Sequence, residues 1–247
     1  MTRSINIDRE EGLIRPIKRK NDPSLGPDVL LALIPKDLDY LIQYVQPERA
    51  FPHDLVFFKV YPVRGGEISF CGPFLGAPQA VMGVEKLIAL GAERVWVYGW
   101  CGSLQPDLKI GDLVIPTGAI SEEGTSRHYP VGDRPVTTDE ALNQRIEAAL
   151  KKDGCAFQRG TVWTTDAPYR ETPDKVKAYR DEGVLAVDME MSALMTLAAF
   201  RSIKLTGLLV VSDELFDLKW HTGFKDPRFE HISRRALELL VRVIVKD

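Results

Sequence analysis

Short apolar runs alternate with amphipathic segments along most of this 247-residue chain. Apolar runs bounded by Gly, Pro or polar residues are typical of buried strands, whereas apolar positions three and four apart are typical of helices that cover a sheet. Strands are therefore expected in 28–35, 55–61, 67–71, 95–99, 156–163, 183–188 and 204–214, with one more inside 100–120. Helices are expected in 36–45, 79–90, 138–153, 176–182 and 189–200, and from about Arg228 to the last residue. The alternation predicts a single α/β layered domain.

The first 27 residues follow a different pattern. They are polar and are punctuated by Pro16, Pro23, Gly26 and Pro27, which indicates an irregular arm. We therefore expect an N-terminal arm over 1–27 and one domain over 28–247. The sequence contains no repeat or linker that would divide this domain further.

Composition and charge narrow the range of partners. With 45% hydrophobic residues, 27% charged residues and a formal charge of -3, the chain has no electrostatic reason to bind nucleic acid or an anionic membrane. No stretch reaches the roughly 18 apolar residues of a membrane span. Three cysteines without CxxC spacing and four histidines without paired spacing predict no disulfide framework, no metal and no organic cofactor. A small-molecule ligand and a reducing, cytoplasmic compartment are expected.

One corner combines structural and chemical signals. The segment 183–200 reads GVLAVDMEMSALMTLAAF, in which a short apolar run meets Asp188 and turns into an apolar helix. Asp is a strong helix N-cap, so Met189 and Glu190 are expected in the first helical turn, where backbone N–H groups lack internal partners. Two interpretations remain open here: Glu190 complements the helix dipole, or it binds a ligand.

In α/β sheets, ligands bind beyond the carboxyl ends of the strands. The segments expected to follow the strands, and therefore to carry the chemistry, are 35–40, 72–78, 99–103, 122–128, 165–170, 188–190 and 212–214. A dinucleotide-binding Rossmann site is disfavoured, because Gly72 and Gly76 do not form a G-x-G-x-x-G motif after the first strand.

Three motifs in these segments carry a family resemblance. YGWCGSLQPDLKIGDLVIP, AVDMEMSAL and VVSDE, in this order, resemble the nucleoside phosphorylase superfamily, which includes purine nucleoside phosphorylase, uridine phosphorylase and methylthioadenosine nucleosidase. The resemblance implies a three-layer α/β/α sandwich around a mixed central β-sheet. It also implies a homo-oligomer built from dimers, with a trimer or a hexamer as open alternatives. The loop EEGTSRHYP is similar to uridine phosphorylases and Ser212-Asp213 to the purine branches, so the base remains open.

The resemblance also implies roles for particular residues. Cleavage of a ribose–base bond passes through a sugar cation, so the site needs negative charge near the ribose and an acid at the leaving base. Glu190 would bind the ribose hydroxyls, Met189 would pack on the sugar, and Asp213 would donate the proton. The remaining expectations concern the base and the acid: Ser212, Tyr169 and Arg170 beside the base, and Arg228 as support for Asp213.

The expected phosphate side departs from the family pattern. The Gly-Asp-Pro-x-Arg loop of the family aligns with residues 36–40, the second arginine aligns with Val97, and the usual Ser or Thr aligns with Trp100. Losing one charge-assisted contact costs about 1.5–3 kcal/mol, which argues against the usual phosphate mode.

Three alternatives follow. In the first, Lys36, with Arg64 or an arginine of a neighbouring subunit, rebuilds a site for inorganic phosphate as co-substrate near Gly99. In the second, Trp100 and Tyr40 fill the anion site and water attacks the ribose, with Asp37 or a neighbouring acid activating the water. In the third, the protein binds nucleosides without cleaving them.

Overall fold

The computed structural model describes residues 12–45, 52–55, 57–63 and 68–245. Its strands are β1 (Asp28–Ala32), β2 (His53–Leu55), β3 (Phe58–Pro62), β4 (Ser69–Gly72), β5 (Arg94–Ser103), β6 (Leu113–Ser121), β7 (Phe157–Thr164), β8 (Ala186–Asp188), β9 (Lys204–Glu214) and β10 (His221–Thr222). Its α-helices are α1 (Pro35–Tyr44), α2 (Ala77–Leu90), α3 (Glu140–Lys152), α4 (Pro173–Asp181), α5 (Met191–Arg201) and α6 (Pro227–Val245). Short 3₁₀ turns, η2 (Ser126–His128) and η3 (Pro168–Arg170), lie in two of the loops.

All ten strands belong to one mixed sheet in the order β10-β9-β6-β7-β8-β5-β1-β4-β3-β2. An additional parallel pairing joins β9 to β5. Since β8 pairs with both β5 and β7, and β6 pairs with both β7 and β9, five of the strands form a closed ring. The expected single-domain mixed α/β fold is confirmed, and the ring closure is a feature that the hydrophobic pattern did not predict.

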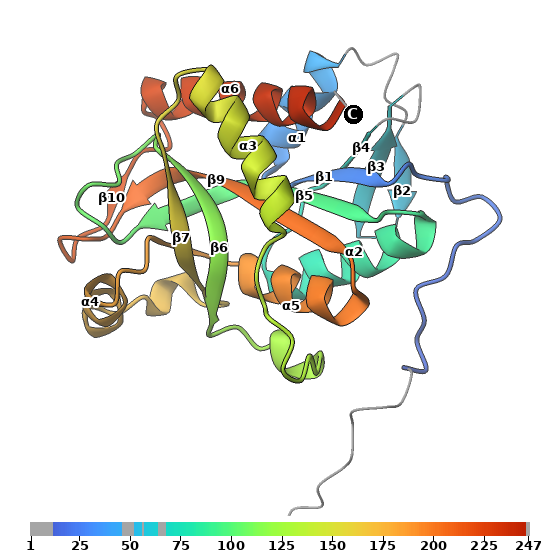
Figure 1. The fold of residues 1–247 in the computed structure, drawn as a ribbon, viewed down its shortest axis with the longest axis horizontal. Helices are drawn as coiled ribbons and strands as arrows, with labels where there is room; N and C mark the ends of the chain where they lie inside the picture. Colours follow the sequence, from blue (N-terminus) through green and yellow to red (C-terminus); the bar gives the residue numbers. More distant parts are fainter. Residues whose placement is uncertain (1–11, 46–51, 56, 64–67, 246–247) are drawn as a thin grey trace, which may run out of the picture.

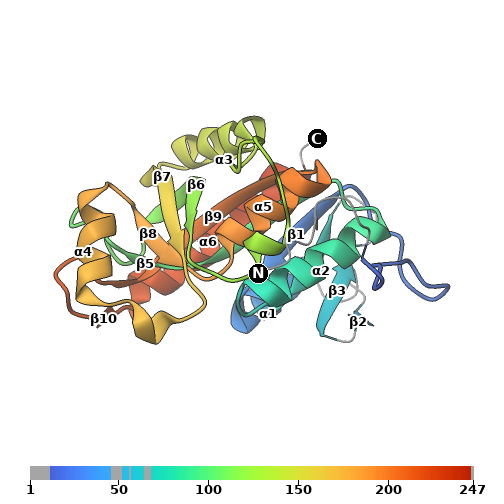
Figure 2. The ribbon, with the colours of Figure 1, turned by 90° about the horizontal axis from the view of Figure 1, so that it is seen from below.

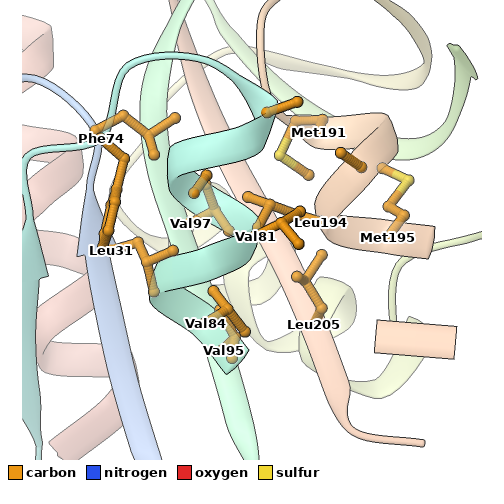
Figure 3. Packing of buried hydrophobic residues seen from close by; sticks show 14 of the residues in the cluster. Leu31, Phe74, Val81, Val84, Val95, Val97, Met191, Leu194, Met195 and Leu205 are labelled. Atoms are coloured by element: carbon orange, nitrogen blue, oxygen red, sulfur yellow. The ribbon is translucent and has the colours of Figure 1, made fainter. Parts of the chain in front are cut away.

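Helices cover both faces of this sheet. In Figure 1, α2 and α5 lie on one side of the central strands, and α1, α3 and α6 lie on the other; Figure 2 gives the view from below. Figure 3 shows the first layer, in which Val81 and Val84 of α2 and Leu194 of α5 meet Val95 and Val97 of β5. On the opposite face, a second apolar cluster packs α1, α3 and α6 against the sheet. The strands that carry the site are therefore fixed from both sides.

Residues 12–27, the described part of the expected arm, have no regular secondary structure. They run along α2, where the Leu25 N–H donates to the Leu90 carbonyl and the Lys86 ammonium donates to Asp22. The expected stop of α2 is confirmed at Gly91, which adopts a left-handed conformation with φ 119°. The expected hairpin is present as β3 and β4, but its turn at 64–66 lies outside the described residues.

Some element boundaries differ from the sequence-based expectation. β5 continues beyond Gly99 to Ser103 because β9 and the short β8 pair with its last residues, so Trp100 is a strand residue and not a loop residue. β9 spans Lys204–Glu214 as expected, and Ser212 and Asp213 therefore lie just before its last residue. The helix after the corner begins at Met191, two residues later than expected. No helix in the described part of the chain has the length and apolar character needed to cross a bilayer.

Candidate active site

A cavity of about 590 Å³ opens where β5, β8 and β9 end. This is the edge at which ligands bind in α/β sheets. The residues that line it are Leu33, Ile34, Pro35, Pro73, Phe74, Leu75, Gln79, Trp100, Cys101, Gly102, Pro168, Tyr169, Glu171, Val187, Asp188, Met189, Glu190, Ser212, Asp213, Leu215, Trp220 and Phe224. Most of this wall is apolar or aromatic, and four side chains in it are carboxylic acids. Such a cavity suits a small ligand with a flat, apolar part and several hydroxyl groups.

Asp188 organises the corner between β8 and α5. One of its carboxylate oxygens accepts the N–H groups of Glu190 at 2.8 Å and Met191 at 2.6 Å, and the other accepts the Thr164 hydroxyl at 2.6 Å. These bonds satisfy N–H groups at the start of α5 that have no partner within the helix. The expected capping role of Asp188 is therefore confirmed. The cap also fixes the backbone of Met189 and Glu190 as the chain passes the cavity.

Glu190 is a carboxylic acid held inside the cavity wall. Only 6% of the residue is exposed, and its Oε1 accepts the Gly76 N–H at 2.6 Å from the loop before α2. Burial raises the pKa of Glu190 to about 8, and the nearby Asp188 carboxyl adds to the rise. Burial thus favours the protonated form of Glu190 at neutral pH. A ligand that donates hydrogen bonds to it would favour the charged form.

Asp213 lies opposite this corner, near the end of β9. Its carboxylate accepts the Ser212 hydroxyl at 2.6 Å and the Trp220 indole N–H at 2.9 Å. Burial raises the pKa of Asp213 above its ordinary value, against the effect of these two donors. A partly buried acid with a raised pKa is suited to proton transfer near neutral pH.

The expected support of Asp213 by Arg228 is wrong. The Arg228 guanidinium donates to the Ile110 carbonyl at 2.9 Å and to the Asp112 carboxylate at 2.5 Å. Because Arg228 is at the start of α6, its side chain reaches the turn before β6 and not the cavity. Trp220, in the segment between β9 and β10, supplies a donor to Asp213 instead.

The base side of the site also differs from the expectation. Tyr169 borders the cavity with 96% of its surface exposed, whereas Arg170 is exposed and does not line the cavity. The residue that turns inward is Glu171. Burial raises the pKa of Glu171 to about 7, and the nearby Asp213 carboxyl contributes to the rise. A three-residue 3₁₀ turn has no hydrophobic periodicity, so the sequence held no signal that favoured Glu171 over Arg170.

The residues expected to hold phosphate or water lie behind Trp100. The Trp100 indole lines the cavity and donates its N–H to Asp37 at 2.8 Å. Asp37 is only 3% exposed, is also bonded by the Ser233 hydroxyl, and does not line the cavity. The Lys36 ammonium lies 4.7 Å from the centre of the Trp100 ring. Of the described residues that were expected on the phosphate or water side, Trp100 is therefore the one that lines the cavity.

Gly99 and Tyr40, which belong to the same expectation, contact other parts of the protein and not the cavity. Gly99 packs so closely on Leu33 that an added Cβ would lie 2.7 Å from its side chain. The Tyr40 hydroxyl donates to Glu238 of α6, so Tyr40 does not fill an anion site in this cavity, contrary to expectation. Arg64 lies outside the described residues. Of the described residues that line the cavity, none is Lys, Arg or His.

This geometry defines a class: an α/β protein with a cavity lined by carboxyl groups and apolar side chains where strands of its sheet end. The chain belongs to the phosphorylase superfamily, whose family model matches residues 29–245. The expected membership of the nucleoside phosphorylase group of enzymes is thereby confirmed.

Relatives of this chain include several phosphorylases. A guanosine phosphorylase of Halorubrum lacusprofundi is 33% identical over 180 residues, which are 72% of this chain and 74% of that protein. A purine nucleoside phosphorylase of the DeoD type from Bacillus cytotoxicus is 35% identical over 183 residues, covering 72% and 77% of the two chains.

Solved structures show the same fold. A uridine phosphorylase of Vibrio fischeri superposes with a TM-score of 0.80 at 22% identity, covering 90% of this chain and 93% of that one. A purine nucleoside phosphorylase of Toxoplasma gondii, in complex with immucillin-H, gives a TM-score of 0.81 at 22% identity and covers 96% and 97%.

Proposed function

We propose that this protein cleaves the N-ribosidic bond of a nucleoside, with phosphate as the acceptor, as the names of its relatives indicate for those proteins. The observation that carries the proposal is that Met189, Glu190 and Asp213, which come from two separate strand ends, line the same cavity. An acid for the base and a carboxyl group for the sugar are the two groups that this reaction needs.

In the proposed reaction, the bond between C1′ and the base nitrogen breaks and its electron pair leaves with the base. Asp213 donates a proton to the base, which leaves as a neutral molecule. Glu190, ionised by hydrogen bonds from the 2′ and 3′ hydroxyls, stabilises the positive charge that develops on the sugar. An oxygen of the acceptor then forms the new bond to C1′. Met189 contacts the apolar face of the ribose with its flexible thioether.

Hydrolysis is the second candidate, because one observation favours it. A phosphate dianion would enter a cavity that has four carboxyl groups and no cationic side chain among its described lining residues. Any of these carboxyl groups that is ionised would repel the phosphate, whereas water carries no charge and is not repelled. For phosphorolysis, a cation must come from elsewhere, and a neighbouring subunit of a homo-oligomer is the source that we propose. The exposed Tyr169 and Leu75 at the cavity are compatible with such a neighbour.

Product analysis tests the proposal and separates the acceptors. Purified protein is incubated with purine and pyrimidine nucleosides, with and without phosphate, and base, ribose and ribose 1-phosphate are quantified. Release of ribose 1-phosphate only when phosphate is present supports phosphorolysis, whereas release of ribose in both samples supports hydrolysis.

The variant Asp213→Asn is expected to lower kcat by about 10²- to 10⁴-fold, the usual contribution of a general acid. The matched control is Asp217→Asn, which changes an exposed carboxylate in the loop after β9 that pairs with His221. Tight nucleoside binding with no cleavage by the unmodified protein would contradict the enzymatic proposal and would indicate a binding protein.

A further inference from the structure

The carboxyl group of Asp213 receives one hydrogen bond on each of its oxygens. The Ser212 hydroxyl donates to Oδ1 at 2.6 Å, and the Trp220 indole N–H donates to Oδ2 at 2.9 Å. Oδ2 lies at the cavity wall, since a Cβ added to Gly102 would be 3.0 Å from it. Rotation of the carboxyl group about its Cβ–Cγ bond would break both hydrogen bonds, so the pair of donors fixes its plane.

Trp220 reaches Asp213 because the chain folds back on itself after β9. The two residues of β10 pair antiparallel with the end of β9, and Thr222 lies opposite Asp213. The Gly223 N–H donates to the Ser212 carbonyl at 2.7 Å and so fixes the returning strand. Trp220 directly precedes β10, which holds its backbone beside the acid.

The side chain of Trp220 is held by a chain of aromatic contacts. Although 62% exposed, Trp220 lines the cavity and meets Phe224 at a centroid distance of 6.3 Å with the rings 69° apart. Phe224 stacks on Trp100 at 5.8 Å, and Trp100 makes an edge contact with Phe229 at 5.0 Å. Trp100 also donates its N–H to the buried Asp37. The contacts therefore run from the interior of the protein to the acid.

The Trp220 indole is a neutral donor, and this decides its effect on the acid. A cation beside Asp213 would strongly favour the ionised form, which has no proton to give. The ionisable groups whose charge interacts with that of Asp213 are themselves acids, Glu171 and Cys101. Ionisable side chains of the adjoining segments pair among themselves: Asp217 with His221, and Glu214 with Lys109. An indole can thus orient the carboxyl group without a positive charge.

We propose that Trp220 is a positioning residue for the proton donor Asp213, and that Phe224 and Trp100 hold Trp220 in place for this role. The inference rests on the proposed nucleoside cleavage and adds to it the group that orients its acid. When Asp213 gives its proton to the leaving base, the carboxylate that remains keeps the bonds from Ser212 and Trp220. Both bonds then stabilise the new negative charge.

The test is Trp220→Phe, which keeps an aromatic ring and removes the N–H. We expect kcat to fall by about 10- to 100-fold, because the acid is no longer held in one orientation, while KM changes little. Burial raises the pKa of Asp213 and the donors Ser212 and Trp220 oppose it. Loss of one donor therefore moves the limb at which kcat falls with rising pH to higher pH.

Two further variants complete the comparison. Lys219→Gln is the matched control, because Lys219 is the exposed neighbour of Trp220 and does not line the cavity. It is expected to keep the kcat and the pH profile of the unmodified protein. Phe224→Leu leaves the indole N–H but removes the aromatic contact, so its kcat is expected to lie between those of the control and Trp220→Phe. A kcat of Trp220→Phe equal to that of the control, or a pH limb that does not move, would overturn the inference.

A measurement without turnover separates this inference from the proposed function. In protein labelled with ¹⁵N in its tryptophan indoles, the N–H signal that disappears in Trp220→Phe belongs to Trp220. We expect this signal to shift with pH as Asp213 ionises, and to lose that shift in Asp213→Asn. If no nucleoside is cleaved but the shift depends on Asp213, the proposed function fails and the coupling of Trp220 to the acid stands. If nucleosides are cleaved but the Trp220 signal does not respond to Asp213, the inference fails and the proposed function stands.

Discussion

At the scale of single residues, the site is defined by carboxyl groups whose uncharged form is favoured by burial. Glu190 and Glu171 have pKa values raised to about 8 and about 7, and in both cases burial is the main cause. A buried acid without a cation is unfavourable when ionised, so Glu190 and Glu171 stay protonated to higher pH than exposed carboxyl groups do. Hydroxyl or N–H donors of a bound ligand would favour the ionised form. Part of the binding energy of such a ligand would then be used to ionise the site.

This arrangement makes the stability of the protein depend on pH. Between pH 4.5, the ordinary pKa of Glu190, and about pH 8, the folded protein holds a proton on Glu190 that the unfolded chain releases. Because the folded state binds more protons, the free energy of unfolding falls as the pH rises through this window, by up to about 1.4 kcal/mol per pH unit. In Glu190→Gln the side chain cannot ionise, so the free energy of unfolding is expected to decrease less over the same pH range.

Urea unfolding of both proteins at several pH values within this window measures the effect. Glu182→Gln is the control, since it changes an exposed carboxylate of the same size. Asp37 and Asp188 also have pKa values raised to about 6. They are expected to account for the pH dependence of the free energy of unfolding that remains in Glu190→Gln. Parallel curves for the unmodified protein and Glu190→Gln would contradict the assignment.

The sequence predicted some of these residues and missed others, for identifiable reasons. Met189, Glu190 and Asp213 lie at strand ends, and the end of a strand is marked by the hydrophobic pattern. Glu171 and Trp220 lie in irregular segments, where no periodicity indicates which side chain turns inward. Arg228 was misplaced because its distance from Asp213 along the chain gives no information about which turn its long side chain reaches.

At the scale of elements, the junction of β8 with α5 is the most strongly determined part of the site. Asp188 is fully buried by its surroundings and receives three hydrogen bonds from two elements. Asp139 at the start of α3 is a simpler cap, because its side chain accepts one N–H, that of Leu142, and is partly exposed. The two caps therefore allow a comparison, within one protein, of a buried cap with several hydrogen bonds and a simple helix cap.

We expect Asp188→Ala to lower the free energy of unfolding by about 2–4 kcal/mol, because loss of the cap and the unpaired buried donors both contribute. Asp139→Ala is expected to cost about 1 kcal/mol, the usual value for a helix N-cap. Denaturant unfolding of both variants gives the comparison. If Asp188→Ala were the less harmful change, the corner would not be held in the way the structure indicates.

At the scale of the whole molecule, the alternation of apolar and amphipathic segments was sufficient to predict one α/β domain, and the family resemblance added the mixed sheet. It was not sufficient to predict that five strands close into a ring. The ring depends on the pairing of β5 with β9, which joins segments about 110 residues apart in the sequence, as the pairing of Arg94 with Lys204 shows. The same pairing extends β5 beyond Gly99 to Ser103. Long-range pairing therefore decided that Trp100 belongs to a strand and not to a loop.

The placement of the tryptophans has an optical consequence. Trp100 and Trp220 line the cavity and each donates its indole N–H to a carboxyl group, whereas Trp96 and Trp163 are fully buried and do not line it. Indole emission responds to the polarity and hydrogen bonding around the ring. A ligand that displaces water from this cavity changes the surroundings of two of the four tryptophans, so the protein carries an intrinsic fluorescent reporter of occupancy that works without bond cleavage.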